Sequence, residues 1–236
     1  MEKSRLFRRL ASGKEILIMP VVHDALCAKI AQKAGFKIIF MGGYSNSASL
    51  LGKPDVNLLT LTEMADCASR IVDAVDIPVF ADGDTGHGNV TNVARTVRLF
   101  EKAGVAGIFI EDQAAPKRCG HMSGKKVIPA HEMVGKIKAA LDARKDPDFV
   151  VMARTDAIAV HGIDDAIHRA KLYEKAGADM ISVDAVETVE QMRRITGEIE
   201  IPKMVSVIHG GKTPILSAEE FKKIGYDIVL YTTCCT

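Results

Sequence analysis

The residues best suited to chemistry are concentrated in the segment 108–121, which reads IFIEDQAAPKRCGH. An apolar run short enough for a buried strand becomes acidic at Glu111 and Asp112. A polar loop follows that places Cys119 among three basic side chains, Lys117, Arg118 and His121. Carboxylates at the tip of a strand, followed by a thiol in a cationic loop, favour metal-assisted chemistry beside a mobile acid or nucleophile.

The cysteine in this loop differs from the other cysteines of the chain. A lone cysteine is usually a small buried side chain, and we expect that for Cys27, Cys67, Cys234 and Cys235. The sequence around Cys119, PKRCGHMSGKK, is mostly polar and basic. We therefore expect an exposed loop whose cations lower the thiol pKa. A general acid must carry its proton, however, so loop closure would have to set the working state.

A repeated pattern predicts the elements that position these residues. Four segments combine a helix tail, a glycine and an apolar strand, and the glycines stand where a helix end favours positive φ: Gly35, Gly104, Gly177 and Gly225. Four further apolar runs occupy residues 16–22, 77–81, 149–153 and 201–208. Helical spacing fills the intervening segments, and Asp164 is a candidate cap for one of them.

Eight strands alternating with helices predict a parallel sheet, and eight units in one chain predict a single (β/α)8 TIM barrel domain over residues 1–236. A doubly wound open sheet is the structural alternative. The eighth strand, residues 228–232, is followed almost at once by the last residue. We therefore expect the eighth helix to be absent from this chain, and a neighbouring subunit to cover that strand.

In such a barrel, catalytic groups stand at the C-terminal ends of the strands. The predicted strands end in His23 and Asp24, in the GGYSN run that contains Gly43, Tyr44 and Ser45, and in a ring of polar residues: Asp82, Asp84, Glu111, Asp112, Arg154, Asp156, Asp184, Ser206 and His209. Asp82, Asp84 and Glu111 offer only oxygen ligands, which suit Mg²⁺ or Mn²⁺ and argue against zinc. Alternatively, some of these carboxylates cap helices or pair with Arg95 and Arg154. Arg154 itself suits a clamp on a substrate carboxylate.

Composition excludes several other classes of protein. The 236 residues carry a net charge of only +1, which favours neither nucleic acid nor a membrane surface as a partner. No apolar run approaches the length of a bilayer span, and the basic start of the chain lacks the apolar core of a secretion signal. Five cysteines without a CxxC pair indicate a reducing compartment. These features predict a soluble cytoplasmic protein.

Five motifs carry a resemblance to a known family: LLGKPD, FADGDTGHGN, IEDQAAPKRCGH, PDFVVMARTDA and GGKTP. From about Leu17 to its last residue, the chain resembles the isocitrate lyase and phosphoenolpyruvate mutase superfamily. KRCGH is the most specific of these motifs and resembles the signature of the lyase branch, which includes isocitrate, 2-methylisocitrate and 2,3-dimethylmalate lyases.

The resemblance implies roles for individual residues. Asp82 would bind Mg²⁺ directly, and its shell would be completed, partly through water, by Asp84, Glu111 and Asp55. The substrate carboxylate would receive donors from Gly43, Tyr44 and Ser45. Cys119 would be the acid in a closing loop that also brings Lys117, Arg118 and His121 to the site, opposite the clamp Arg154. The family also implies a homotetramer that exchanges a C-terminal helical segment between subunits, and by this resemblance we expect that segment to be missing from residues 1–236.

The chain departs from the lyase pattern at three positions that the resemblance places in the substrate pocket. Asp184 stands where lyases usually have glutamate, Ser206 replaces an asparagine, and His209 replaces a glutamate. These changes concern the identity of the substrate.

The expected function is Mg²⁺-dependent cleavage of the C2–C3 bond of a 2-hydroxy di- or tricarboxylate, of the alkylmalate or methylisocitrate type, to a 2-oxo acid such as pyruvate or glyoxylate and a second carboxylate. Tyr44, His209 and a metal-bound water are equal candidates for the base. Two alternatives stay open: an oxaloacetate decarboxylase or hydrolase, or a phosphonopyruvate-type P–C enzyme, on the same barrel; and a non-catalytic dicarboxylate-binding protein.

Overall fold

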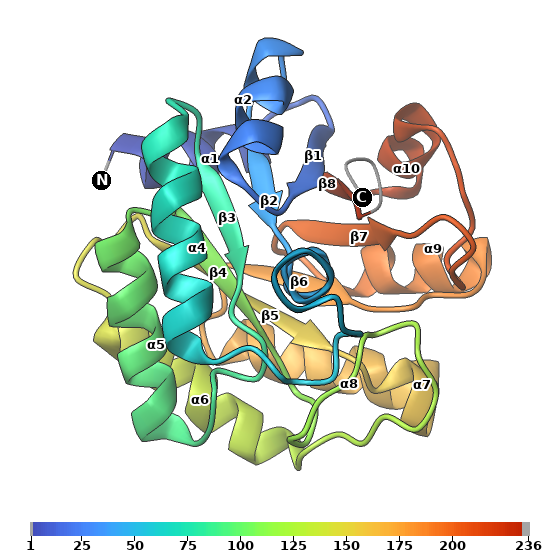
Figure 1. Ribbon diagram of the computed structural model, residues 1–236. Helices are drawn as coiled ribbons and strands as arrows, with labels where there is room; N and C mark the ends of the chain where they lie inside the picture. Colours follow the sequence, from blue (N-terminus) through green and yellow to red (C-terminus); the bar gives the residue numbers. More distant parts are fainter. Residues whose placement is uncertain (1, 233–236) are drawn as a thin grey trace.

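Eight parallel strands close into a barrel whose order in space is their order in the chain (Figure 1). The architecture is that of a computed structural model, which describes residues 2–232. The strands are β1 (Leu17–Val22), β2 (Ile39–Met41), β3 (Val79–Asp82), β4 (Gly107–Glu111), β5 (Val150–Thr155), β6 (Met180–Val183), β7 (Lys203–Val207) and β8 (Ile228–Tyr231). The ring closes where Leu17 of β1 pairs with Ile228 of β8 in parallel register. The predicted (β/α)8 barrel is confirmed, and the open doubly wound alternative is wrong.

Helices alternate with the strands and surround the barrel (Figure 1). They are α1 (Glu2–Ala11), α2 (Ala25–Lys33), α3 (Gly43–Asn46), the π-helix η1 (Ser47–Leu51), α4 (Leu61–Ala74), α5 (Val90–Ala103), α6 (Ala130–Ala143), α7 (Ile158–His161), α8 (Ile163–Lys175), α9 (Val189–Glu198) and α10 (Ala218–Ile224). Within residues 2–232, none of these helices combines the length and the hydropathy that crossing a bilayer requires.

The repeated glycines end helices as the sequence predicted. Gly35, Gly104, Gly177 and Gly225 all have positive φ, between 87° and 112°, a conformation that glycine adopts without the steric penalty of a Cβ atom. The prediction for Asp164 was wrong. Gly162 is the residue that precedes α8, while Asp164 lies in the first turn and pairs with Arg194 at 2.7 Å.

Side chains that alternate along the strands fill the barrel and then form the site. Phe80, Phe109 and Met152 belong to the apolar cluster inside the barrel. Two residues further along the same strands stand Asp82, Glu111 and Arg154. Because successive side chains of a strand point to opposite faces, these polar groups continue the inward-facing rows. The site is thus the polar end of the barrel core.

Helix α1 closes the other end of the barrel. Phe7 is fully buried, and its ring centroid lies 5.0 Å from that of Phe80. Arg8 fixes the helix by donating to the backbone oxygen of Asp148 at 2.8 Å and by pairing with Asp179. The N-terminal end of the barrel is therefore filled with packed side chains.

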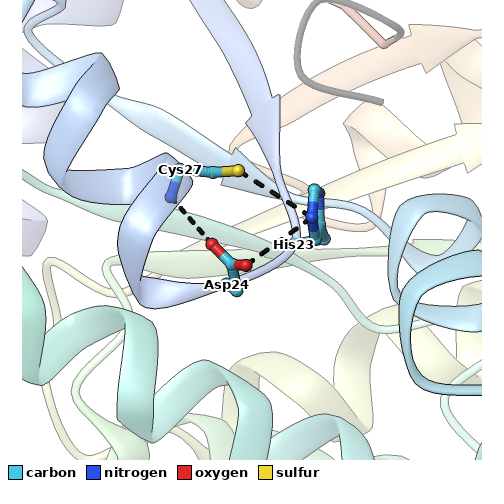
Figure 2. A group of neighbouring side chains, drawn as sticks. All are labelled: His23, Asp24 and Cys27. Atoms are coloured by element: carbon cyan, nitrogen blue, oxygen red, sulfur yellow. Dashed lines mark hydrogen bonds and ion pairs between the residues drawn. The ribbon is translucent and has the colours of Figure 1, made fainter.

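The end of β1 does not contribute its polar residues to the site. Figure 2 shows His23, Asp24 and Cys27 together at the start of α2. The Asp24 carboxylate accepts the Cys27 backbone N–H at 2.7 Å and so caps the helix. Nε2 of His23 lies 3.8 Å from the sulfur of Cys27 and 3.7 Å from Asp24. This group is explained by helix capping and lies outside the cavity described below.

The cysteines expected to be buried behave differently from one another. Cys67 is buried, and its thiol contacts the Asn46 side-chain oxygen at 3.0 Å. Cys27 is only half-buried. Cys234 and Cys235 lie outside the described residues.

Candidate active site

A cavity of about 290 Å³ opens at the C-terminal ends of the strands. It is lined by most of the residues that the sequence predicted for the site: Gly43, Tyr44, Ser45, Asp55, Asp82, Lys117, Arg118, Cys119, His121, Arg154, Asp184, Ser206 and His209. Asp84 and Glu111 are buried beside this lining, where Asp84 pairs with Lys117 and Glu111 with Arg154. Residues from every part of the chain thus meet at one mouth of the barrel.

Three carboxylates form a buried acidic cluster at the ends of β3 and β4. Asp82, Asp84 and Glu111 are at most 5% exposed. Burial raises the pKa of Asp84 to about 6 and raises the pKa of Glu111 well above its usual value. Within the described residues, one oxygen of Glu111 is buried with no hydrogen-bond partner. A buried set of acids with an unused oxygen calls for a cation, and the all-oxygen donors fit Mg²⁺.

Lys117 supplies one cation to these acids from the loop. Its ammonium lies 2.7 Å from Asp55 and 2.6 Å from Asp84, with the side chain 2% exposed. Burial alone would lower the pKa of Lys117, but the surrounding carboxylates raise it well above its usual value. Lys117 therefore stays positively charged and neutralises part of the acidic cluster.

The guanidinium of Arg154 is held by three carboxylates. It lies 2.9 Å from Asp156, 3.0 Å from Asp184 and 3.3 Å from Glu111. It also stands over the Phe109 ring, 5.4 Å from the centroid. Two of its donors are aimed at Asp156 in the forked geometry that arginine prefers. The protein thus fixes the orientation of Arg154 before any ligand binds.

Cys119 lies half-buried at the mouth of the cavity, and its backbone N–H donates to the Asp55 carbonyl at 3.0 Å. The expected lowering of its thiol pKa was wrong. Burial raises the pKa of Cys119, and this outweighs the opposing contributions of the His121 backbone and Arg154. Lys117 and Gly120, which flank this part of the loop, are buried, although Arg118 and residues 122–124 are exposed. Cys119 is therefore a thiol at neutral pH, as a proton donor must be.

Arg118 is fixed through its backbone, and its side chain is exposed. The Gln113 amide accepts the Arg118 N–H at 3.0 Å and donates to the Arg118 carbonyl at 2.8 Å. Arg118 itself is exposed, and its guanidinium reaches the Ser123 carbonyl at 3.5 Å. It lies at the rim of the cavity, so its contribution to the site is the backbone clamp with Gln113.

The turn after β2 uses some of its predicted donors internally. The Gly43 N–H donates to Asp82 at 2.9 Å, and the Ser45 hydroxyl donates to the Gly42 carbonyl at 3.0 Å. Tyr44 is 44% exposed. Across the cavity, Ser206 is buried and His209 is exposed. Both residues line the cavity.

His121 fastens the loop to the segment after β7. Its Nδ1 accepts the Lys212 backbone N–H at 3.0 Å, and burial lowers the pKa of His121 below its usual value. The bond requires a neutral imidazole, because protonated Nδ1 can only donate. The contact serves to hold the loop, and it is distinct from the roles that sequence reasoning gave to His121.

This contact predicts a pH dependence of substrate binding. Lowering the pH from about 8 to about 5 is expected to raise KM once the pH passes below the lowered pKa of His121, since protonation breaks the bond to Lys212. KM should be measured across this range in the wild type and in His121→Asn, whose side-chain oxygen can accept the same N–H without titrating. An acid limb of equal steepness in both proteins would contradict the role of His121.

Two residues of the site had no role in the sequence reasoning. Lys125 is buried and contacts Gly120 and Asp156, and Asp156 is fully buried beside Arg154. Asp156 was visible as a polar residue at a strand end. Lys125 carries no such signal, because in the sequence it is indistinguishable from its neighbour Lys126.

The sequence matches the family described as phosphoenolpyruvate phosphomutase over residues 7–235. It is 49% identical over 233 residues to the 2,3-dimethylmalate lyase of Eubacterium barkeri, a match that covers 99% of this chain and 81% of that protein. It is 42% identical over 225 residues to the 2-methylisocitrate lyase of Bacillus subtilis strain 168, covering 95% of this chain and 74% of that protein.

Among solved structures, oxaloacetate acetylhydrolase in complex with the inhibitor 3,3-difluorooxalacetate superposes with a TM-score of 0.94 and 35% identity, over 99% of this chain and 80% of that one. Sequence and fold agree. The chain belongs to the phosphoenolpyruvate mutase and isocitrate lyase superfamily.

Proposed function

We propose that the protein is a Mg²⁺-dependent carbon–carbon lyase that cleaves a 2-hydroxy di- or tricarboxylate to a 2-oxo acid and a second carboxylate. The observation that carries the proposal is the protonated, half-buried thiol of Cys119, which lines the same cavity as the carboxylate of Asp82. Cleavage next to a carboxylate requires a proton donor and a cation site in the same cavity.

The residues fit a divalent metal. Asp82, Asp84, Glu111 and Asp55 would hold Mg²⁺, with Mn²⁺ as a possible substitute, directly or through water. When bound, the metal would act as a Lewis acid that lowers the pKa of the substrate hydroxyl. Lys117, placed between Asp55 and Asp84, balances the remaining negative charge when the loop is closed.

The chain's own groups account for the proton transfers. A base removes the proton of the 2-hydroxyl, and Tyr44 and His209 both line the cavity as candidates. The C2–C3 bond breaks, the C2 oxygen becomes a carbonyl, and C3 keeps the electron pair. Cys119 then gives its proton to C3 and becomes a thiolate. Arg154, oriented by Asp156 and Asp184, attracts the carboxylate next to the reacting carbons.

The cavity walls favour a substrate with alkyl substituents. Besides the polar groups, the lining contains five apolar side chains: Val21, Phe40, Phe109, Ile208 and Leu230. A methyl group at C3 would lie against such a wall, whereas a third carboxylate would lose its hydration there. Similarity to the 2,3-dimethylmalate lyase supports the same substrate class. We infer an alkylmalate as the preferred substrate.

Hydrolysis of oxaloacetate is the second candidate. It is supported by the close superposition on oxaloacetate acetylhydrolase and by the altered pocket residues Ser206 and His209. This reaction also breaks a C2–C3 bond and delivers a proton to C3, which becomes the methyl group of acetate, while water supplies the oxygen added at C2.

We also propose a homotetramer. Leu26 and Ile30 on α2 are 66% and 57% exposed, and Leu50 and Leu58 about half. An apolar surface of this kind is typical of a subunit interface.

The function is tested by measuring 2-oxo acid release from 2,3-dimethylmalate, 2-methylisocitrate, isocitrate and oxaloacetate, each with Mg²⁺ and with a chelator. We expect metal-dependent pyruvate from 2,3-dimethylmalate. Turnover of oxaloacetate alone would establish the second candidate. If none of the four compounds is turned over but a dicarboxylate raises the thermal stability of the protein, the protein would be a binding protein.

The metal site makes a separate prediction. Asp82→Asn is expected to weaken Mg²⁺ binding roughly 10–100-fold, because a neutral amide replaces the carboxylate that accepts the backbone N–H groups of Gly43 and Asp84. Isothermal titration with Mg²⁺ measures the change. Asp73→Asn, on helix α4 away from the cavity, is the matched control. Equal Mg²⁺ affinity in both variants would remove Asp82 from the metal site.

A further inference from the structure

A buried ammonium holds the far side of the loop that carries Cys119. The side chain of Lys125 is 1% exposed. Its Nζ donates to the Gly120 carbonyl and, at 3.0 Å, to a carboxylate oxygen of Asp156. A charge taken so completely out of water is retained only where its partners are fixed. Lys125 thus joins the middle of the loop to the end of β5.

Asp156 connects this contact to Arg154. Both oxygens of its fully buried carboxylate receive donors from Arg154, at 2.9 and 3.0 Å, and one of them also receives the ammonium of Lys125. The nearby carboxylate of Asp112 accepts the Asp156 backbone N–H at 2.9 Å. The chain of contacts therefore runs from Gly120 through Lys125 and Asp156 to the guanidinium that faces the cavity.

Lys125 adds to the other attachments of the loop, which include the bond from Lys212 to His121. Lys117 fastens its start to Asp55 and Asp84, and Gln113 clamps the backbone of Arg118. Lys125 fastens the other side. If Lys125 moved out with the loop, it would leave Asp156 and remove a positive charge from the carboxylate that orients Arg154. Loop position and the environment of Arg154 are coupled through one ammonium.

We propose that Lys125 is a positioning residue that holds the loop of residues 117–124 closed and, through Asp156, sets Arg154 at the same time. When the loop closes, Arg154 is therefore oriented for the substrate carboxylate at the same time. The attachment of the loop stands on the contacts alone, whereas the consequence for turnover rests on the proposed function.

The matched pair Lys125→Met and Lys126→Met tests the attachment without any substrate. Lys126 is adjacent but exposed, and both substitutions remove one positive charge. Hydrogen–deuterium exchange should be followed at the backbone N–H of Cys119, which the closed loop donates to Asp55. We expect exchange in residues 117–124 to become about tenfold faster in Lys125→Met, with no change in Lys126→Met. Lys125→Arg, which keeps the charge, should restore most of the protection.

Two results would overturn the proposal. Unchanged exchange of the loop in Lys125→Met would show that Lys125 does not hold it. Faster exchange throughout the barrel, with no excess in residues 117–124, would show a general structural role. If Lys125→Met does not fold, Lys125→Gln provides the same comparison with a polar side chain of similar reach.

The coupling to Arg154 is tested with oxalate and Mg²⁺ as the probe. In the wild type, oxalate should slow loop exchange, and in Lys125→Met it should bind yet leave exchange unchanged. On the true substrate, Lys125→Met should lower kcat/KM by about 10–100-fold through misplaced groups. Equal slowing by oxalate in both proteins would refute the coupling. Failure of oxalate to bind the wild type would count against the proposed function and leave the exchange comparison intact.

Discussion

Replacing Cys119 by alanine is expected to lower kcat by about 10²–10⁴-fold, the usual effect of removing a general acid. Burial keeps the thiol protonated, and alanine leaves the small volume at the cavity mouth without a donor. KM should change little, because the loop is fastened by other residues: Lys117, Gln113 and Lys125. Both constants are measured by steady-state kinetics at saturating Mg²⁺, with whichever of the four tested acids proves to be the substrate.

Cys27→Ala is the matched control, since Cys27 is half-buried like Cys119 but lies at the start of α2 (Figure 2). It should retain wild-type kcat. The wild type should also lose activity as the pH rises through the raised pKa of Cys119, because the thiolate cannot donate a proton. Full turnover by Cys119→Ala with the true substrate would show that another group is the acid.

Gly120→Ala is expected to reduce kcat/KM by about 10²-fold or more by preventing closure of the loop. A Cβ atom built on Gly120 lies 2.8 Å from Cγ of Asp184 and closer still to its Oδ2 and to Nη2 of Arg154. Asp184 is buried and Arg154 is largely buried, and an ion pair joins them, so moving either side chain away is costly. The loop must therefore stay out, and Cys119 with it.

Open and closed loops are distinguished by alkylation of Cys119 with iodoacetamide, located by peptide mass spectrometry. Gly120→Ala should be modified faster than the wild type. Gly197→Ala is the control for the substitution itself, because a Cβ atom there has nothing within 4 Å. Wild-type kinetics in Gly120→Ala would mean that turnover does not require the loop to close.

The fold could be predicted from the sequence because its signals are local. Glycine after a helix, apolar runs and the alternation of strand and helix each depend on a few neighbouring residues, and all follow from backbone sterics and burial. Because side chains alternate along a strand, Asp82, Glu111 and Arg154 point inward like the core residues two positions before them, and so reach the site. For these residues, local pattern and three-dimensional position agree.

What escaped prediction depends on contacts between distant segments. The Cys119 thiol pKa is set by how deeply the loop is buried, and a polar, basic sequence gives no measure of that depth. Lys125 and Lys126 are adjacent and identical in type, yet one is buried against Asp156 and the other is exposed. Only the path of the loop across the barrel decides between them.

The packing of Phe7 against Phe80 has a kinetic consequence. With α1 filling the N-terminal end of the barrel, the passage that residues 2–232 leave to a bound ligand is at the opposite mouth, where the loop that carries Cys119 lies. Substrate arrival and departure of both products must share that passage, so they occur in sequence and each waits for the loop to open. The opening rate therefore sets an upper limit on turnover that no improvement in the chemical step can exceed.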